Sequence, residues 1–408
     1  MTPTSPTTAS TKTAKLIDQA ETWSAHNYHP LPVVLVKGEG VWVYDPDGNR
    51  YMDMLSAYSA LNQGHRHPKI VQALKDQADK ITLTSRAFHN ELFGPFCETL
   101  CKIAGMEMAL IMNSGAEAVE TAVKTARKWG YQVKKVPQDQ AEIIVCNDNF
   151  HGRTTTIVGF SSEPQYKEDF GPFTPGFKLI PYGDLKALEA AITPNTVGFL
   201  VEPIQGEAGI LIPPDGYLKG AADLCRKKRV LLISDEIQTG FGRTGRMFCS
   251  DWEGVRPDLY VVGKALGGGF LPVSGVIGGR ETLGLFRPGD HGSTFGGNPL
   301  ACAVGLAALD VLVSENLAER SAEMGNHFMQ RLRTLRSPRV KEVRGRGLLI
   351  GVHIKDEHGT ARPYCEKLMA LGILAKETHG QVIRFAPPLT ISREEADWAL
   401  ERIAQVLA

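Results

Sequence analysis

The sequence lacks several features that mark particular classes of protein. Its 408 residues carry 45 Lys plus Arg and 45 Asp plus Glu, so the formal net charge is zero and no global attraction to nucleic acid or to an anionic membrane is expected. No apolar run approaches the roughly 18 uninterrupted residues that a membrane-spanning helix needs. With 43% hydrophobic and 22% charged residues, the composition is that of an ordinary globular protein with two or three folding units.

Other absences narrow the possible ligands and the compartment. The seven cysteines are scattered and include no C-x-x-C pair, which favours a reducing compartment, and with no localisation motif visible we take the cytoplasm as the default. His65 and His67 have no acidic or thiol ligands at metal spacing nearby, so we favour a turn and expect no metal site. There is no P-loop and no G-x-G-x-x-G after a strand, which counts against nucleotide binding.

The first 60 residues suggest a tail followed by a small structured segment. Residues 1–15 are mostly Thr, Ser, Pro and Ala without the apolar stretch of a secretion signal, and we predict a disordered tail. Leu16 to Ala25 has helical spacing, and Gly40 to Met54 alternates like a hairpin that turns at Asp45–Gly48. We assign residues 16–60 to the N-terminal segment of a small domain.

The middle of the chain alternates between short apolar runs and helical segments. Five runs predict strands, at 108–112, 142–146, 198–202, 230–235 and 259–263. Helices are predicted between them, for example at 117–129, 184–192 and 217–228. Continuous apolar strands separated by helices indicate an α/β fold, in which a mostly parallel, doubly wound sheet is covered on both faces. We assign this large domain to residues 61–305.

Beyond residue 305 the pattern changes. Strands are predicted at 347–354 and 382–385 between helices, and a last helix opens at the capping box Ser392-Arg-Glu-Glu395. We therefore predict that residues 306–408 form the rest of a smaller α+β domain.

Chemically distinctive residues follow three of the predicted strands, where ligands bind in such sheets. Lys264 comes directly after a buried strand and before three glycines; most lysines are solvated, but partial desolvation would make this one a usable Schiff-base nucleophile. Asp235 ends an apolar run and is either a helix N-cap or the counter-charge of a protonated ring nitrogen, as pyridoxal phosphate requires. Residues 114–116 could hold an anion at a helix N-terminus, although this signal alone is weak.

Six ordered segments carry a resemblance to a known family. From about residue 25 to the C-terminus, their order and spacing resemble the class III pyridoxal-phosphate aminotransferases of fold type I. The segments are Asn113-Ser-Gly-Ala-Glu-Ala118, Asn149-Phe-His-Gly-Arg153, Val201-Glu-Pro-Ile-Gln-Gly-Glu207, Asp235-Glu-Ile-Gln-Thr-Gly240 with Arg243-Thr-Gly245, Gly263-Lys264, and Ser293-Thr-Phe-Gly-Gly-Asn-Pro299.

This resemblance implies a set of cofactor contacts. Lys264 would hold pyridoxal 5′-phosphate covalently and act in catalysis, and Asp235 would pair with the pyridine nitrogen. Phe150 would stack on the ring, unless it is only a core aromatic, and Gln238 would lie near the 3′ oxygen.

The phosphate contacts implied by the resemblance involve two subunits. Ser114, Gly115 and Ala116 would cradle the phosphate, and Thr294 would reach the phosphate of the neighbouring subunit, although a simple Ser-Thr turn is the alternative for Thr294. The implied assembly is a homodimer with shared sites.

Three further segments bear on the substrate. Asn27–Pro32, Ser56–His65 and Leu83–Phe88 resemble the ornithine δ-aminotransferase branch rather than the acetylornithine, 4-aminobutyrate or glutamate-semialdehyde branches. This implies transfer of the δ-amino group of L-ornithine to 2-oxoglutarate, giving glutamate 5-semialdehyde and L-glutamate. One departure is His151, which stands where other members carry Trp and to which we assign no direct chemical role.

The same resemblance implies the substrate contacts. Arg153 would bind the distal carboxylate of either substrate, and Arg384 the inner carboxylate of the oxo acid. Glu207 would pair with Arg384 while ornithine reacts and release it for the oxo acid. Tyr28 would hydrogen-bond the α-amino group of ornithine, and Tyr58 would line the same pocket, with a purely structural tyrosine as the alternative for each.

Two rival functions stay open at this point. One keeps the fold but changes the chemistry, as in a 4-aminobutyrate or N-acetylornithine aminotransferase, an aminomutase or a decarboxylating relative. The other is a scaffold or ligand sensor that has lost catalysis, against which the completeness of the motif set argues.

Overall fold

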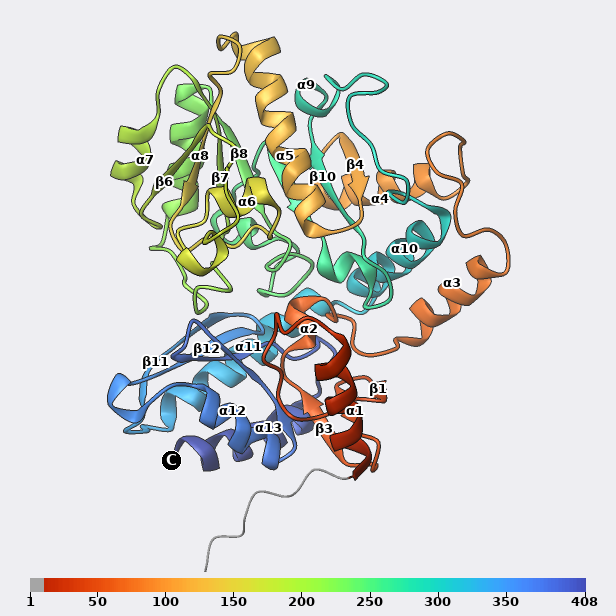
Figure 1. Ribbon diagram of the computed structural model, residues 1–408, viewed down its shortest axis with the longest axis vertical. Helices are drawn as coiled ribbons and strands as arrows, with labels where there is room; N and C mark the ends of the chain where they lie inside the picture. Colours follow the sequence, from red (N-terminus) through yellow and green to blue (C-terminus); the bar gives the residue numbers. More distant parts are fainter. Residues whose placement is uncertain (1–10) are drawn as a thin grey trace, which may run out of the picture.

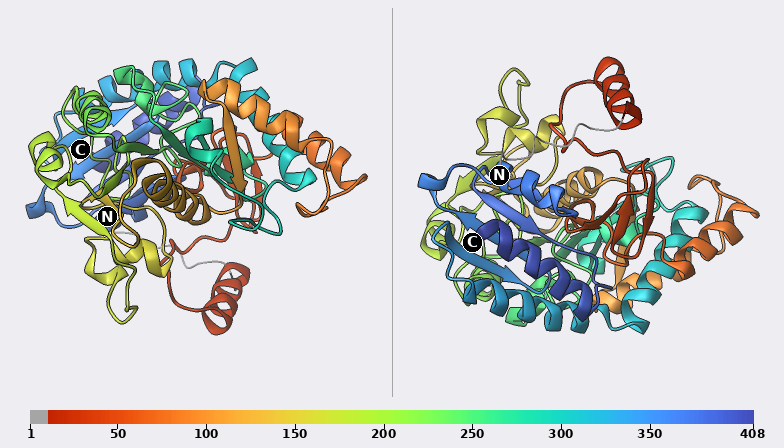
Figure 2. Two further views of the ribbon diagram at one scale, coloured as in Figure 1. Left: turned by 90° about the horizontal axis from the view of Figure 1, so that it is seen from above. Right: turned by 90° about the horizontal axis from the view of Figure 1, so that it is seen from below.

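The computed structural model describes residues 11–408 and divides along its long axis into two parts (Figure 1). The upper part is built on a seven-stranded sheet, and the lower part combines the two ends of the described chain around two four-stranded sheets. The views from above and below show helices outside the sheets (Figure 2).

The large sheet confirms the predicted α/β class. Its strand order is β4-β10-β9-β8-β7-β5-β6, and all neighbours are parallel except β10, which is antiparallel to both β4 and β9. The strands are β4 (Met108–Met112), β5 (Glu142–Cys146), β6 (Phe177–Ile180), β7 (Thr196–Val201), β8 (Leu231–Asp235), β9 (Leu259–Val262) and β10 (Ser274–Gly278). Five of them were predicted to within two residues at either end. β6 and β10 were missed, because Lys178 interrupts the apolar run of β6 and β10 contains two glycines.

Helices cover both faces of this sheet, as predicted. α5 (Gly115–Trp129) packs on the face that includes Ile143 and Val145. The opposite face, which includes Ile144, packs against α8 (Tyr217–Lys228). The other helices of the upper part are α4 (Phe93–Ala104), α6 (Thr155–Gly159), α7 (Leu185–Ala191), α9 (Arg280–Leu283) and α10 (Pro299–Ser314). Successive residues of a strand therefore pack into hydrophobic cores on opposite faces of the sheet, which explains why these strands are unbroken apolar runs in the sequence.

The lower part joins segments far apart in sequence. One sheet pairs β1 (Lys37–Glu39), β2 (Trp42–Tyr44) and β3 (Arg50–Asp53) with β13 (Ile373–Leu374), and the other orders β11 (Val340–Arg346), β12 (Leu349–Ile354), β15 (Val382–Phe385) and β14 (Lys376–Thr378). Its helices include α11 (Leu317–Thr334), α12 (Arg362–Ala370) and α13 (Arg393–Leu407), which opens with the predicted Ser392 capping box. The domain limits at 60 and 305 stay a prediction, and α10 runs across the second.

The N-terminal prediction needs one correction. α1 (Thr11–Trp23) begins before Leu16, so the disordered tail is wrong for residues 11–15, while residues 1–10 lie outside the described part. From Thr11 onward the segment contains no proline and gains helix-forming Ala and Lys, which outweigh its threonines. The predicted hairpin is confirmed, with β2 and β3 antiparallel and the turn closed from Gly48 N–H to the Asp45 carbonyl at 3.1 Å.

No single helix within residues 11–408 is both long and apolar enough to cross a membrane; α10 and α11, bent by 58° between them, meet that requirement only as a pair.

A strained turn connects the N-terminal strands to α3 (Pro68–Ala78). All four residues of α2 (Ser56–Ser59) have positive φ, from 46° at Ala57 to 73° at Ser59, so the turn is left-handed. L-residues avoid this region because the Cβ crowds the carbonyl oxygen. The Asp53 carboxylate stabilises the entry to the turn by accepting the N–H groups of Leu55 and Ser56 at 2.9 and 2.8 Å.

This strain predicts that Ala57→Gly stabilises the protein, by up to about 1 kcal/mol, since glycine tolerates positive φ and the Ala57 side chain is exposed. The thermal unfolding midpoint measures the change. The matched control is Ala190→Gly at an exposed position of the right-handed helix α7, which should lower the midpoint. A fall in both variants would contradict the assigned strain.

Candidate active site

The carboxyl ends of β4, β8 and β9 meet at one edge of the large sheet and border a cavity of about 210 Å³. β4 and β9 point the same way because β10 is antiparallel to both. The cavity therefore combines a helix N-terminus, an aromatic ring, carboxylates and one amine. Its lining comprises Gly115, Ala116, Phe150, His151, Gly152, Glu202, Ile204, Asp235, Ile237, Gln238, Thr239 and Lys264.

The N-terminus of α5 supplies an anion-binding surface. Ser114 caps the helix, and Gly115 and Ala116 are its first two residues, whose N–H groups have no carbonyl one turn earlier. The Ser114 backbone N–H and hydroxyl donate to the Glu117 carboxylate at 2.7 and 3.0 Å. Burial alone would raise the pKa of Glu117, but these hydrogen bonds lower it, so the capping carboxylate is ionised. An incoming phosphate would compete with it for the hydroxyl of Ser114.

A sharp loop after β5 carries three side chains toward the site. Gly152 has a φ of 126°, and a Cβ there would lie 3.0 Å from the Ala116 Cβ, so only glycine lets the loop pack on the start of α5. Phe150 and His151 line the cavity. Arg153 is exposed, with its guanidinium 4.6 Å from the ring centroid of Tyr166 and 5.8 Å from that of Phe150.

Asp235 ends β8 as a buried carboxylate with two donors. Its Oδ1 accepts the Ile237 N–H at 3.1 Å, and its Oδ2 lies 2.7 Å from His151 Nδ1. His151 is thus a residue of the cavity whose contact with Asp235 sequence reasoning missed. The only signal in the sequence was its departure from the expected Trp, which did not reveal the partner 84 residues away.

A second buried carboxylate lies close to the first. Glu202, one residue beyond β7, accepts the Phe150 backbone N–H at 3.0 Å. Burial raises its pKa well above the usual range, and the charge of Asp235 raises it further, while the single hydrogen bond from Phe150 only partly opposes this. Burial and the neighbouring Asp235 carboxylate thus favour the neutral form of Glu202.

Lys264 is placed as an amine that can react. Its φ of 47° is strained for a non-glycine residue, and such strain concentrates at functional sites. Burial lowers its pKa, with the Arg384 charge acting in the same direction and the Glu207 and Asp235 carboxylates opposing it. The neutral, nucleophilic form of the amine is thereby favoured.

An ion pair joins the upper and lower parts next to the cavity. Arg384 on β15 is fully buried, and its guanidinium donates to Glu207 at 2.9 Å. Burial would raise the pKa of Glu207, but the charge and hydrogen bond of Arg384 hold it below the usual range. Gln238 links the two, accepting from Arg384 and donating to Glu207 at 3.1 Å. Gln238 thus contacts both the cavity and the ion pair.

The remaining predicted residues lie around this centre rather than in it. The Arg384 guanidinium is 5.5 Å from the ring centroid of Tyr58, and burial, followed by the Glu207 charge, raises the pKa of the Tyr58 hydroxyl. Tyr28 lies near enough to affect the same pKa but is 68% exposed. Thr294 is exposed and does not line the cavity of its own chain.

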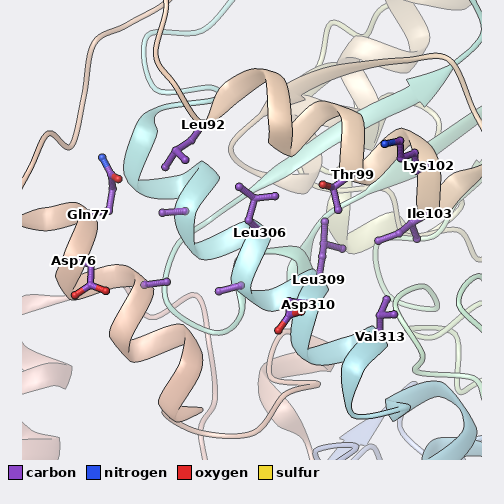
Figure 3. A pocket seen from close by; sticks show the side chains of 13 residues that line it. Asp76, Gln77, Leu92, Thr99, Lys102, Ile103, Leu306, Leu309, Asp310 and Val313 are labelled. Atoms are coloured by element: carbon purple, nitrogen blue, oxygen red, sulfur yellow. The ribbon is translucent and has the colours of Figure 1, made fainter.

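A larger groove of about 750 Å³ lies elsewhere and does not belong to this site (Figure 3). It runs between α3, α4 and α10 and is lined by apolar side chains such as Leu306 and Leu309, with Asp76 and Lys102 at its borders. None of the predicted site residues lines it. Within residues 11–408, no group of three or more His, Cys, Asp or Glu side chains is arranged to hold a metal ion.

The donor set of the cavity matches pyridoxal 5′-phosphate. The α5 N-terminus suits a phosphate, Phe150 can cover one face of a ring, and Asp235 can neutralise a protonated ring nitrogen. Among residues 11–408, the Lys264 amine has no hydrogen bond or ion pair, so it is free to bond to an aldehyde.

Comparisons with known proteins agree with this chemistry. The family model described as "Aminotransferase class-III" matches residues 23–407. The chain is 64% identical to the ornithine aminotransferase of Brevibacillus brevis over 97% of this chain and 98% of that protein. The crystal structure of the Toxoplasma gondii ornithine aminotransferase superposes with a TM-score of 0.95 at 47% identity, covering 97% and 94% of the two chains. That of the Elizabethkingia anophelis acetylornithine aminotransferase gives 0.88 at 46% identity, covering 97% and 98%.

The ion pair predicts a pH-dependent stability change for Glu207→Gln. Because the folded pKa of Glu207 is depressed, its contribution is present above the unfolded value near 4.5 and is lost as the pH falls through the folded pKa. The variant should lose about 2 kcal/mol at pH 7 and less below pH 4.5. Urea unfolding at a series of pH values measures this difference. Glu366→Gln, which breaks the exposed pair with Arg362, is the control and should change little.

Proposed function

The chain belongs to the class III aminotransferase family, and from that premise we propose that it transfers the δ-amino group of L-ornithine to 2-oxoglutarate. The products are L-glutamate and glutamate 5-semialdehyde, which cyclises to pyrroline-5-carboxylate. The single observation that carries the choice of substrate is the 64% identity to an ornithine aminotransferase over nearly the whole of both chains. The cofactor is pyridoxal 5′-phosphate.

The cofactor contacts follow from the cavity. When bound, pyridoxal phosphate supplies a sink for the electrons released as a proton leaves the δ-carbon of ornithine. Asp235 neutralises the ring nitrogen, and Phe150 covers the ring. Ser114, Gly115 and Ala116 bind the phosphate at the start of α5.

Lys264 does the proton chemistry. Its desolvated amine would hold the cofactor covalently and, as a free amine, would be the base that takes the proton from the δ-carbon of the substrate. The Lys264 ammonium would then be the acid that gives this proton back. Glu207 and Asp235 are the carboxylates whose charges raise the pKa of this amine against the effect of burial.

Arg384 and Glu207 let one site accept two unlike substrates. With the pair closed at 2.9 Å, the guanidinium is masked, and the α-carboxylate of ornithine is not drawn to the reacting end. When 2-oxoglutarate enters, its inner carboxylate replaces Glu207 on Arg384. Gln238, which hydrogen-bonds to both partners, would adjust with the pair and would also be the residue that binds the 3′ oxygen of the cofactor.

The outer part of the site recognises the far end of the substrates. Arg153 binds the distal carboxylate, which its exposed and stacked guanidinium can reach from the loop after β5. Tyr28 hydrogen-bonds the α-amino group of ornithine, and Tyr58 lines the pocket between Tyr28 and Arg384.

The active unit in this proposal is a homodimer. Thr294 and Phe295 are exposed on a loop that Ser293 ties to Asn113 at 2.8 Å, next to the phosphate-binding turn. Thr294 reaches the phosphate of the partner subunit, so each site is completed across the interface. We also place the enzyme in the cytoplasm, which its seven unpaired cysteines support.

A panel of amines tests the proposed substrate. Ornithine, N-acetylornithine and 4-aminobutyrate are each supplied with 2-oxoglutarate, and pyrroline-5-carboxylate is trapped as the product of the first. Ornithine should give the highest kcat/KM. A preference for N-acetylornithine would contradict the proposal and favour the other aminotransferase activity.

Tyr28→Ile should raise KM for ornithine about tenfold, because a hydrogen bond to a charged amine is lost, and should leave 4-aminobutyrate nearly unchanged, since this substrate has no α-amino group. The same coupled assay measures both substrates. An equal rise in KM for ornithine and for 4-aminobutyrate would contradict the placement of Tyr28 in the substrate pocket.

Lys264→Ala should abolish both turnover and covalent attachment of the cofactor. Borohydride reduction followed by peptide mapping should find a pyridoxyl label on Lys264 in the wild-type protein and none in the variant. Lys228→Ala, at the end of α8, is the matched control and should label normally. A label on another lysine of the wild-type protein would overturn the assignment.

A further inference from the structure

The tyrosine assigned to the α-amino group of ornithine lies on a segment without regular structure. Tyr28 belongs to residues 24–36, which form neither helix nor strand between α1 and β1, and every residue from 21 to 30 is exposed. At its N-terminal end the segment continues from α1, which projects from the rest of the described chain (Figure 2). A substrate that has to order such a segment on binding loses affinity, so tight binding at Tyr28 requires another part of the fold to hold the segment in place.

Arg362, the first residue of α12, holds this segment by two hydrogen bonds. Its Nη1 donates to the His29 carbonyl at 3.0 Å, and its Nη2 donates to the Pro30 carbonyl at 2.9 Å. The two contacts join residues that are 333 and 332 positions apart in the sequence. Because the guanidinium is a rigid planar fork, it fixes the orientation of two successive carbonyls at once. These are the carbonyls that directly follow Tyr28.

Two carboxylates orient the Arg362 guanidinium. Glu366, one turn further along α12, accepts from Nε at 2.9 Å, and Glu377 on β14 accepts from Nη1 at 3.4 Å. The side chains of Arg362 and Glu377 are only 17% and 19% exposed. Burial alone would lower the pKa of Arg362, but the hydrogen bond to Glu366 and the charge of Glu377 raise it, so the guanidinium keeps its charge. The fork is therefore held facing the segment.

The strand that carries Glu377 also borders the substrate pocket. β14 pairs with β15, and Lys376, next to Glu377, lies opposite Arg384 in the register. Tyr28 and Glu377 both act on the pKa of the Tyr58 hydroxyl, as do Glu207 and Arg384. The contacts of Arg362 thus fix the Tyr28 segment to the same sheet that positions the arginine of the ion pair.

Resting on the proposed function, we propose that Arg362 is a positioning residue that sets the preference for ornithine. By binding the carbonyls of His29 and Pro30, and with Glu377 orienting it, Arg362 places the Tyr28 hydroxyl where it meets the α-amino group of the substrate. Arg362 acts through Tyr28 and does not itself contact the substrate. An amine without an α-amino group gains nothing from this arrangement.

Arg362→Gln removes the fork and should change one kinetic parameter for one substrate. KM for ornithine should rise about fivefold, because the substrate must now order the segment on binding, and kcat should stay near the wild-type value. KM for 4-aminobutyrate and for 2-oxoglutarate should stay unchanged. Arg362→Lys, which keeps the charge but offers no planar fork, should recover part of the ornithine KM.

Two further variants complete the set. Glu377→Gln keeps the fork but removes a charge that orients it, so it should raise the ornithine KM by less than Arg362→Gln does. The matched control is Arg256→Gln, which breaks an arginine-to-carbonyl hydrogen bond, to Gly105 at 3.0 Å, in the upper part of the molecule. It should leave the kinetics of all three substrates unchanged.

A double-mutant cycle tests whether Arg362 acts through Tyr28. In the Tyr28→Ile background the positioned hydroxyl is absent, so adding Arg362→Gln should cause no further rise in the ornithine KM. A purely structural role of Arg362 would instead add its full effect to that of Tyr28→Ile.

The outcomes distinguish this inference from the proposed function. Full additivity in the cycle, or an equal loss on ornithine and 4-aminobutyrate in Arg362→Gln, would overturn the role of Arg362 and leave the assignment of Tyr28 intact. If Arg362→Gln does not fold, Glu377→Gln in the same two backgrounds decides in the same way. A Tyr28→Ile variant with a wild-type ornithine KM would overturn the proposed contact of Tyr28 and this inference together.

Discussion

The structure depends on one constraint: ionisable groups buried together at the carboxyl edge of a sheet must be partnered. Asp235 and Lys264 reach this edge because the apolar strands before them end there, and neither would be tolerated in such a place without neighbours of suitable charge or hydrogen-bonding capacity. His151 partners Asp235, and Arg384 partners Glu207. The low dielectric that makes these contacts obligatory also makes them effective, since it disfavours the charged form of the amine and strengthens the field around the cavity.

The Arg384–Glu207 pair shows why the two parts of the molecule have to meet here. Arg384 comes from β15 near the C-terminus, and Glu207 follows β7 of the large sheet, 177 residues earlier. Buried ion pairs contribute little net stability, because desolvation offsets the attraction. In the proposed mechanism, their value in this position is that one partner can be exchanged for a substrate carboxylate, which requires a guanidinium already dehydrated and held in place. The interface between the two parts therefore forms part of the proposed mechanism.

Much of the large sheet was predictable, because a strand buried on both faces is an uninterrupted apolar run and the helices between such runs have their own periodicity. β5 and α8 were predicted at their observed limits. β10 was missed because Gly275 and Gly278 weaken a pattern based on side chains, although a Cβ at Gly275 would meet the Leu110 carbonyl at 2.7 Å. The start of α1 was misplaced because the composition of residues 1–15 was judged as a whole, whereas the helix begins within that segment, at Thr11.

By itself, the sequence determined which chemical groups are available and in what order, since motifs such as Gly263-Lys264 and Asp235-Glu-Ile-Gln238 are local and their strands follow from local hydrophobicity. The tertiary structure alone decided which of these groups lie within hydrogen-bonding distance of one another. That His151 lies 2.7 Å from Asp235, that burial beside Asp235 raises the pKa of Glu202 and that Gln238 bridges Glu207 and Arg384 depend on distances between segments far apart in the chain. Hydrogen bonds and burial act over a few ångströms in space, and no pattern along the sequence encodes those separations directly.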